Sequence, residues 1–216
     1  MQDEQKHASG PVVAERRGFL AMALGKKEVV YEDVPAESWF APYVSLLLEE
    51  EIAQGYADAQ GNPLGEFGVE NPVTYAELAK LTLEAAGSKA SLTRKSANPT
   101  AVGTWADGYV AVAEMKGFSL FDPSRDVHAP ATRGEVIQTI LEAYGVPTAA
   151  QNVASFEDLP ANHPYAPALS VAVIYGIIDG DTDALGVPTG TVRPDAPVNR
   201  AEVAKILALA REIFGR

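Results

Sequence analysis

The chain carries an internal repeat, and this repeat limits the folds that it can adopt. Residues 31–82 align with residues 156–207 at an offset of 125 without a gap, and more than a third of the aligned positions are identical. A shorter copy lies between them, because Pro130–Glu135 matches Pro197–Glu202 and the spacing of Trp39 and Tyr43 returns at Trp105 and Tyr109. Self-similarity of this kind indicates one domain built from three similar units.

Composition excludes several classes of protein. The chain has 216 residues, of which 47% are hydrophobic, so it can bury a core, and it has no apolar run long enough to span a membrane. Cysteine is absent, which excludes disulfides and thiolate chemistry. A net charge of −12 argues against nucleic-acid binding. Residues 1–7 are polar, so we expect either an intracellular protein or one whose secretion signal has been removed.

Each unit is expected to form a helix, a loop and a second helix. In the first unit, Ser38 is the predicted N-cap, apolar residues recur at helical spacing from Phe40 to Ile52, and Gly55 ends the helix. After a loop rich in Gly, Asn and Pro, Thr74 and Glu77 form a predicted capping box. Matching boxes are predicted at Thr132 with Glu135 and at Asn199 with Glu202, and the first helix of the third unit at about 164–178.

These patterns predict an all-α fold, with three helix-loop-helix repeats in a pseudo-threefold spindle around a central helical bundle. Ala14-Glu15 is followed by Gly25 at the spacing that separates Ala76-Glu77 from Gly87 in a predicted second helix. This match predicts an extra N-terminal capping helix, and a chance match of an alanine-rich segment is the alternative. The predicted segments are a disordered tail (1–10), the capping helix (11–28), repeat 1 (29–87), a short, degenerate repeat 2 (96–146) and repeat 3 (153–216).

The repeats resemble the S-layer homology family. The resemblance rests on the openings Tyr31–Pro35 and Phe156–Pro160, the aromatic and proline residues that follow them, and the three helix starts Val73–Glu77, Ala131–Glu135 and Val198–Glu202. It implies a non-enzymatic module that anchors a surface protein to the bacterial cell envelope or S-layer without covalent bonds. The implied ligand is an anionic, pyruvylated secondary cell-wall polysaccharide, held in grooves between repeats, or in some lineages peptidoglycan.

The resemblance also implies the ligand-binding residues, each with a structural alternative. Arg133 and Arg200 match the family's arginine and could bind a carboxylate in a bidentate manner, or could pair with a nearby acidic side chain. Trp39 and Trp105 could stack on a sugar or lie in the core. Gly55 and Gly180 match a loop glycine that lets the backbone approach the ligand, or are plain C-caps. We expect Arg200→Ala to weaken glycan binding and to leave the fold intact.

No repeat carries the whole family pattern. Repeat 1 has Tyr75 in place of the arginine, repeat 3 has Pro164 in place of the tryptophan, and repeat 2 lacks the opening motif and most of the loop. A protein–protein assembly module with degenerate glycan grooves is therefore the alternative function, and a wall-processing enzyme would need a catalytic domain outside this chain.

Other chemistry has little support in the sequence. The segment Asp179–Asp183 resembles the start of a calcium loop, but Ala184 and Gly190 stand where an EF-hand needs glycine and a bidentate glutamate. The three histidines are not at metal-ligand spacing, and no nucleophile elbow or phosphate loop is present. We therefore predict no cofactor, no metal and no catalytic residue.

Overall fold

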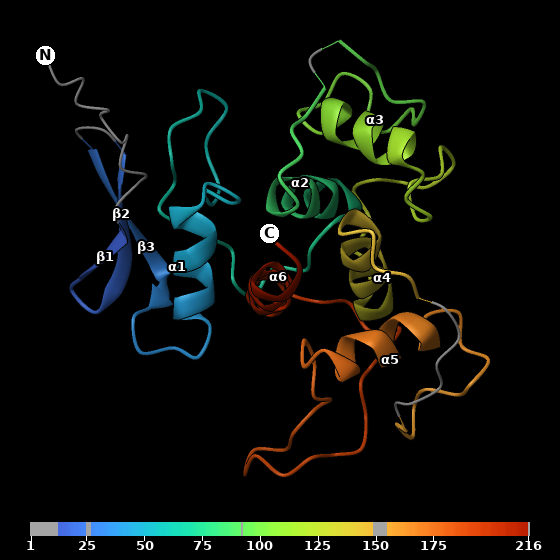
Figure 1. Ribbon diagram of the computed structural model, residues 1–216. Helices are drawn as coiled ribbons and strands as arrows, with labels where there is room; N and C mark the ends of the chain where they lie inside the picture. The colour runs from blue at the N-terminus through green and yellow to red at the C-terminus, as the bar shows by residue number, and fades with distance from the viewer. Residues whose placement is uncertain (1–12, 25–26, 92, 149–154, 216) are drawn as a thin grey trace, which may run out of the picture. The chain divides into compact units, whose positions relative to one another are not determined.

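The computed structural model describes residues 13–24, 27–91, 93–148 and 155–215, and it divides into two compact units, Met1–Val69 and Glu70–Arg216 (Figure 1). The first unit begins with three antiparallel strands in the order β1 (Val13–Arg16), β2 (Phe19–Leu24) and β3 (Lys27–Pro35). The all-α prediction is therefore wrong, as is the predicted capping helix over residues 11–28. The predicted tail, residues 1–10, lies outside the described residues.

A two-residue turn forces this segment into a hairpin. Arg17 and Gly18 both have positive φ, 55° and 83°, which is the backbone of a type I′ turn and matches the twist of paired strands. Phe19 then pairs back to Arg16. Leu20 and Met22 on β2 are buried in the first unit. Their tertiary burial outweighs the helix propensity of the Leu-Ala-Met-Ala sequence.

Helix α1 (Ala41–Glu49) packs on β1 and β2 and completes the first unit together with the loop that ends at Val69. Its start differs from the prediction, because the Ser38 hydroxyl donates to the Pro35 carbonyl (2.7 Å) and does not cap the helix. Pro42 lies in the first turn, where its missing N–H has no helical partner to lose.

The Asp33 carboxylate holds the loop of the first unit. It accepts hydrogen bonds from the backbone N–H groups of Phe67 (2.8 Å), Gly68 (2.6 Å) and Val69 (3.1 Å). At the same place in repeat 3, Asp158 accepts from Val192 (2.9 Å) and Arg193 (2.7 Å). The repeated Glu-Asp sequence therefore marks a repeated loop anchor.

Removing this anchor is expected to destabilise the protein. Asp33→Ala leaves three N–H donors without their acceptor, and we expect the free energy of unfolding to fall by about 2–3 kcal/mol. Urea denaturation measures the change, with Glu37→Ala as the control because Glu37 is an exposed carboxylate close by. Equal denaturation midpoints for the two variants would show that the carboxylate does not hold the loop.

The second unit contains α2 (Tyr75–Ala85), α3 (Asp107–Lys116), α4 (Arg133–Ala143), α5 (Ala166–Ile174) and α6 (Arg200–Phe214). Helices α2, α4 and α6 pack against one another, α3 packs on α2, and α5 packs on α4 (Figure 1). The helix predicted at about 164–178 is shorter than expected. All three predicted capping boxes are confirmed, at Thr74, Thr132 and Asn199, so the helices that pack together begin where the sequence indicates.

The segments that precede these three helices form a closed ring of backbone hydrogen bonds. The Val73 N–H donates to the Val198 carbonyl (2.9 Å), the Ala131 N–H to the Val73 carbonyl (2.8 Å), and the Val198 N–H to the Ala131 carbonyl (3.4 Å). Each segment thus donates to one neighbour and accepts from the other. This ring, called here the backbone ring, brings the first turns of α2, α4 and α6 together.

Candidate functional site

Side chains at the starts of α2, α4 and α6 form contacts with the same cyclic pattern as the backbone ring. The first residue of each helix contacts the capping-box glutamate of the next helix, and we call these three contacts the belt. Arg200 contacts Glu77 (Nη1–Oε1, 2.9 Å), Tyr75 contacts Glu135 (Oη–Oε2, 2.7 Å), and Arg133 contacts Glu202 (Nη1–Oε1, 3.4 Å).

Three of the five charged residues in the belt are buried, and the other two, Glu77 and Glu202, are partly exposed. Arg133 and Arg200 are only 9% and 6% exposed, and Glu135 is 6% exposed. Burial of a charge is tolerated when the charge is paired and hydrogen-bonded. Each glutamate therefore has two functions: it caps its own helix and it accepts a hydrogen bond from the first residue of a neighbouring helix, which is an arginine in two of the three contacts.

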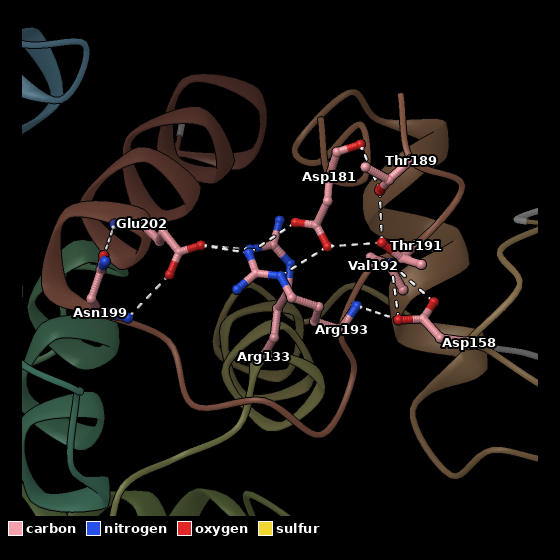
Figure 2. Close-up of polar contacts among 9 residues, drawn as sticks. All are labelled: Arg133, Asp158, Asp181, Thr189, Thr191, Val192, Arg193, Asn199 and Glu202. Carbon is pink, nitrogen blue, oxygen red and sulfur yellow. Dashed lines mark hydrogen bonds and ion pairs between the residues drawn. The ribbon is translucent and has the colours of Figure 1, made fainter. Parts of the chain in front are cut away.

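Where α4 meets α6, Arg193 joins the belt contact between Arg133 and Glu202 (Figure 2). Arg193, on the loop before α6, donates to Glu202 through Nη2 (2.9 Å) and binds the Asp181 carboxylate with both Nε and Nη2 (2.8 Å each). Arg133 lies against the same Glu202. We call Arg133, Asp181, Arg193 and Glu202 the four-residue cluster.

The charges of this cluster balance, and each one shapes the others. Burial would raise the pKa of Asp181, but its hydrogen bonds and ionic contact with Arg193 hold the pKa below its usual value. Burial lowers the pKa of Arg133, and the nearby carboxylates of Glu202 and Asp181 only partly offset this effect. The Nε atom of Arg133 is buried and has no hydrogen-bond partner among the described residues, so this guanidinium retains a donor that the cluster does not use.

The corresponding place between α2 and α4 has different chemistry. Glu135 accepts from the hydroxyl of Tyr75 and from Arg125 Nη1 (2.9 Å), and Arg125 lies 4.6 Å above the Tyr75 ring. Burial would raise the pKa of Glu135, but hydrogen bonds from Thr132 and Tyr75 and the charge of Arg125 hold it below its usual value. Here a neutral hydroxyl replaces the arginine of the other two belt contacts.

The two tryptophans occupy equivalent places in two repeats. Trp39 stands two residues before α1 and Trp105 two residues before α3, and their exposed fractions are 56% and 58%. The alternative that they lie in the core is wrong. Both tryptophans of the chain are therefore more than half exposed.

The S-layer homology domain model matches residues 30–79 and 155–204. The chain contains S-layer homology domains. The two matches do not include the middle repeat, residues 96–146, so three tandem S-layer homology repeats remain a prediction from the pattern of the chain. The chain is also 29% identical over 119 residues to the middle cell wall protein of Brevibacillus brevis, which covers 54% of this chain and 9% of that protein.

The loop glycines of the S-layer homology domains lie against aromatic rings. A Cβ at Gly55 would come within 2.8 Å of the Tyr31 ring, and one at Gly180 within 2.6 Å of the Phe156 ring, and both glycines have positive φ. The observed contacts are thus internal to the repeat, and a ligand contact at either glycine remains a prediction.

The S-layer homology residues predicted from the sequence do not gather in one place. Arg133 and Arg200 contact different glutamates, and Arg200 lies in the belt next to Glu77. Sequence reasoning missed Arg193, considered Asp181 only as part of a segment that resembles a calcium loop, and missed Arg125. A position-by-position comparison of the repeats could have found the first two, because they stand where repeat 1 has Gly68 and Tyr56.

The acidic loop of repeat 3, which lies in the second matched region, uses the Asp183 carboxylate for hydrogen bonds to its own segment. Asp183 Oδ1 accepts from the N–H groups of Leu185 (2.8 Å) and Val187 (2.9 Å), as Asp58 does from Gln60 and Asn62 in repeat 1. The described residues contain no group of three His, Asp or Glu side chains that could hold a metal ion. Nor does any helix among them have the length and apolar character needed to cross a membrane.

Proposed function

We propose that this chain anchors a surface protein to the bacterial cell wall by binding an anionic, pyruvylated secondary polysaccharide, and that it performs no catalysis. The S-layer homology domains and the similarity to a cell wall protein both support association with the cell wall. The chain covers only a small part of that relative, so the cargo and the whole-protein activity are part of the proposal.

The exposed tryptophans carry the proposal. Exposing more than half of a tryptophan side chain costs the free energy that its burial would contribute, and this chain does so twice at the same place in the repeat. A flat aromatic ring with a free face can stack on the apolar face of a pyranose. Trp39 and Trp105 are therefore the proposed sugar contacts.

The charge of the chain restricts where the acidic group of such a glycan can bind. With a net charge of −12, the surface as a whole repels anions, so an anion site has to be local. The N-termini of α4 and α6 favour an anion, and the guanidinium groups there, which Glu202 and Glu77 now partner, would exchange that carboxylate for one of the ligand. These features support carboxylate recognition at Arg133 and Arg200 as a proposal.

Trp105→Ala and Trp39→Ala test the proposal. Loss of a stacking ring is expected to weaken binding to purified cell-wall sacculi by about tenfold for each variant, whereas thermal stability changes little because both rings are exposed. Co-sedimentation over a range of sacculus concentrations gives the affinities. Leu185→Ala is the control, because Leu185 is an 88% exposed apolar residue of the second unit and the substitution keeps its backbone N–H, which bonds to Asp183.

The outcomes separate three functions. Loss of binding after acid has removed the secondary polymer from the sacculi identifies that polymer as the ligand. Binding that survives acid treatment identifies peptidoglycan. If the unaltered chain binds neither preparation from its source organism, the anchoring proposal fails and the protein-assembly alternative replaces it.

A further inference from the structure

Arg193 adopts a backbone conformation that disfavours its side chain. Its φ is +50°, in the left-handed region where residues other than glycine are strained, and the equivalent residue of repeat 1 is Gly68 with φ +80°. The loop conformation is thus the same in both repeats, but repeat 3 places a long cationic side chain where glycine fits without strain. Strain that persists at one position is a reason to look for a function there.

The Arg193 side chain already forms the contacts that a ligand carboxylate would need. Its Nε and Nη2 atoms donate to the two oxygens of Asp181 at 2.8 Å each, which is the bidentate geometry of arginine–carboxylate recognition. The Thr191 hydroxyl lies 3.4 Å from Asp181 Oδ2 and adds a further donor. Nearly half of the Arg193 side chain is exposed, so the pair can be reached from solvent.

Repeat 1 lacks both members of this pair. Tyr56 stands at the position of Asp181, and its ring occupies the space that a side chain at Gly68 would need, because a Cβ there would lie 2.3 Å from the ring. Repeat 1 fills the place with an aromatic ring, whereas repeat 3 builds an ion pair in it. The ion pair is therefore a property of the third repeat and is not required by the shared loop conformation.

Of the remaining cluster residues, Arg133 places a second guanidinium beside the pair. Arg133 reaches Glu202 from α4, and its buried Nε has no hydrogen-bond partner in the part of the chain that the structure describes. Figure 2 shows the Arg133 and Arg193 side chains converging between Glu202 and Asp181. A carboxylate that replaces the Asp181 side chain would thus meet the fork of Arg193 with the positive charge of Arg133 nearby.

We propose that Arg193 is the residue of this chain that selects a carboxylate-bearing glycan, and that Asp181 occupies its fork as an internal competitor until the ligand displaces it. This inference rests on the proposed function and assigns its anion contact to a residue that the sequence did not indicate. Displacement exchanges one carboxylate for another, so the cluster keeps its charge balance in both states. The apparent affinity of the chain for the glycan then depends on the fraction of molecules in which Asp181 does not occupy the Arg193 guanidinium.

Three variants test the inference by co-sedimentation with sacculi that carry the secondary polymer. Arg193→Gly introduces the residue of repeat 1 and relieves the strain, and we expect it to weaken binding by at least about tenfold without a large loss of thermal stability. Asp181→Asn weakens the competitor and is expected to tighten binding by about three- to tenfold. Asp183→Asn is the matched control, because it removes the same charge from the same loop at a carboxylate that accepts from the backbone N–H groups of Leu185 and Val187.

Each outcome has a distinct meaning. Failure of the unaltered chain to bind the sacculi overturns the proposed function itself. If the unaltered chain binds and both Arg193→Gly and Asp181→Asn bind as it does, the inference is overturned and the ion pair is structural. If Asp181→Asn and Asp183→Asn tighten binding equally, net charge explains the gain and the competitor role of Asp181 is rejected.

Discussion

Replacing Arg200 with alanine is expected to lower the free energy of unfolding by about 3–5 kcal/mol. The Arg200 side chain is 6% exposed and its Nη1 lies 2.9 Å from Glu77, so the variant leaves a largely buried carboxylate without this cationic partner. The sequence predicts loss of binding with an intact fold for the same variant, and burial of the side chain changes that expectation. Chemical denaturation followed by circular dichroism measures the effect.

Arg200→Tyr is the matched rescue. Tyr75 occupies the equivalent position at the start of α2 and donates its hydroxyl to Glu135, which shows that a tyrosine can fill a belt contact. We expect this variant to recover at least about 1 kcal/mol of the loss. If Arg200→Ala unfolds at the same denaturant concentration as the unaltered chain, the belt does not contribute to stability and Arg200 is available for the predicted ligand role.

Glu135→Ala is expected to have an effect of similar size, about 3–5 kcal/mol, for a different set of reasons. The substitution removes half of the capping box at Thr132 and leaves the Tyr75 hydroxyl and the Arg125 guanidinium without their shared acceptor. Because the pKa of Glu135 is held below its usual value, this carboxylate stabilises the fold above the pKa of an unfolded glutamate. The difference between variant and parent should therefore shrink as the pH falls below about 4.

The control for this variant is Glu212→Ala, which removes an exposed carboxylate from the last turn of α6. A surface substitution of this kind is expected to change stability by less than about 0.5 kcal/mol. Both variants lose one negative charge, so a general charge effect would shift them equally. A similar midpoint for the two would contradict the assigned network at Glu135.

Local chemistry explains which parts of the fold could be predicted. The capping boxes at Thr74, Thr132 and Asn199 were visible because they satisfy N–H groups within four residues of sequence. The sheet was missed because its decisive signal, the turn at Arg17 and Gly18, is short and the strands beside it contain good helix formers. Strand pairing depends on contacts across the hairpin that a propensity does not contain.

The candidate site shows the same division. The sequence marked Arg133 and Arg200 as important but could not show that each is buried against a glutamate from a neighbouring helix, because those partners are 69 and 123 residues away. The sequence indicated that Trp39 and Trp105 are important, but it did not show that both are exposed. Arg193 stands where repeat 1 has Gly68, which the sequence contains, but the φ angle of Arg193 is what shows that glycine would fit there with less strain.

The backbone ring makes the second unit differ from an open array of repeats. In a solenoid each repeat touches only its neighbours, so the array has two ends and can lose a terminal repeat. Here the segment before α2 bonds to the segment before α6, and the array closes on itself without an end that needs a cap. The closed ring fixes at three the number of segments in it, and it cannot form during synthesis until Val198 has been made.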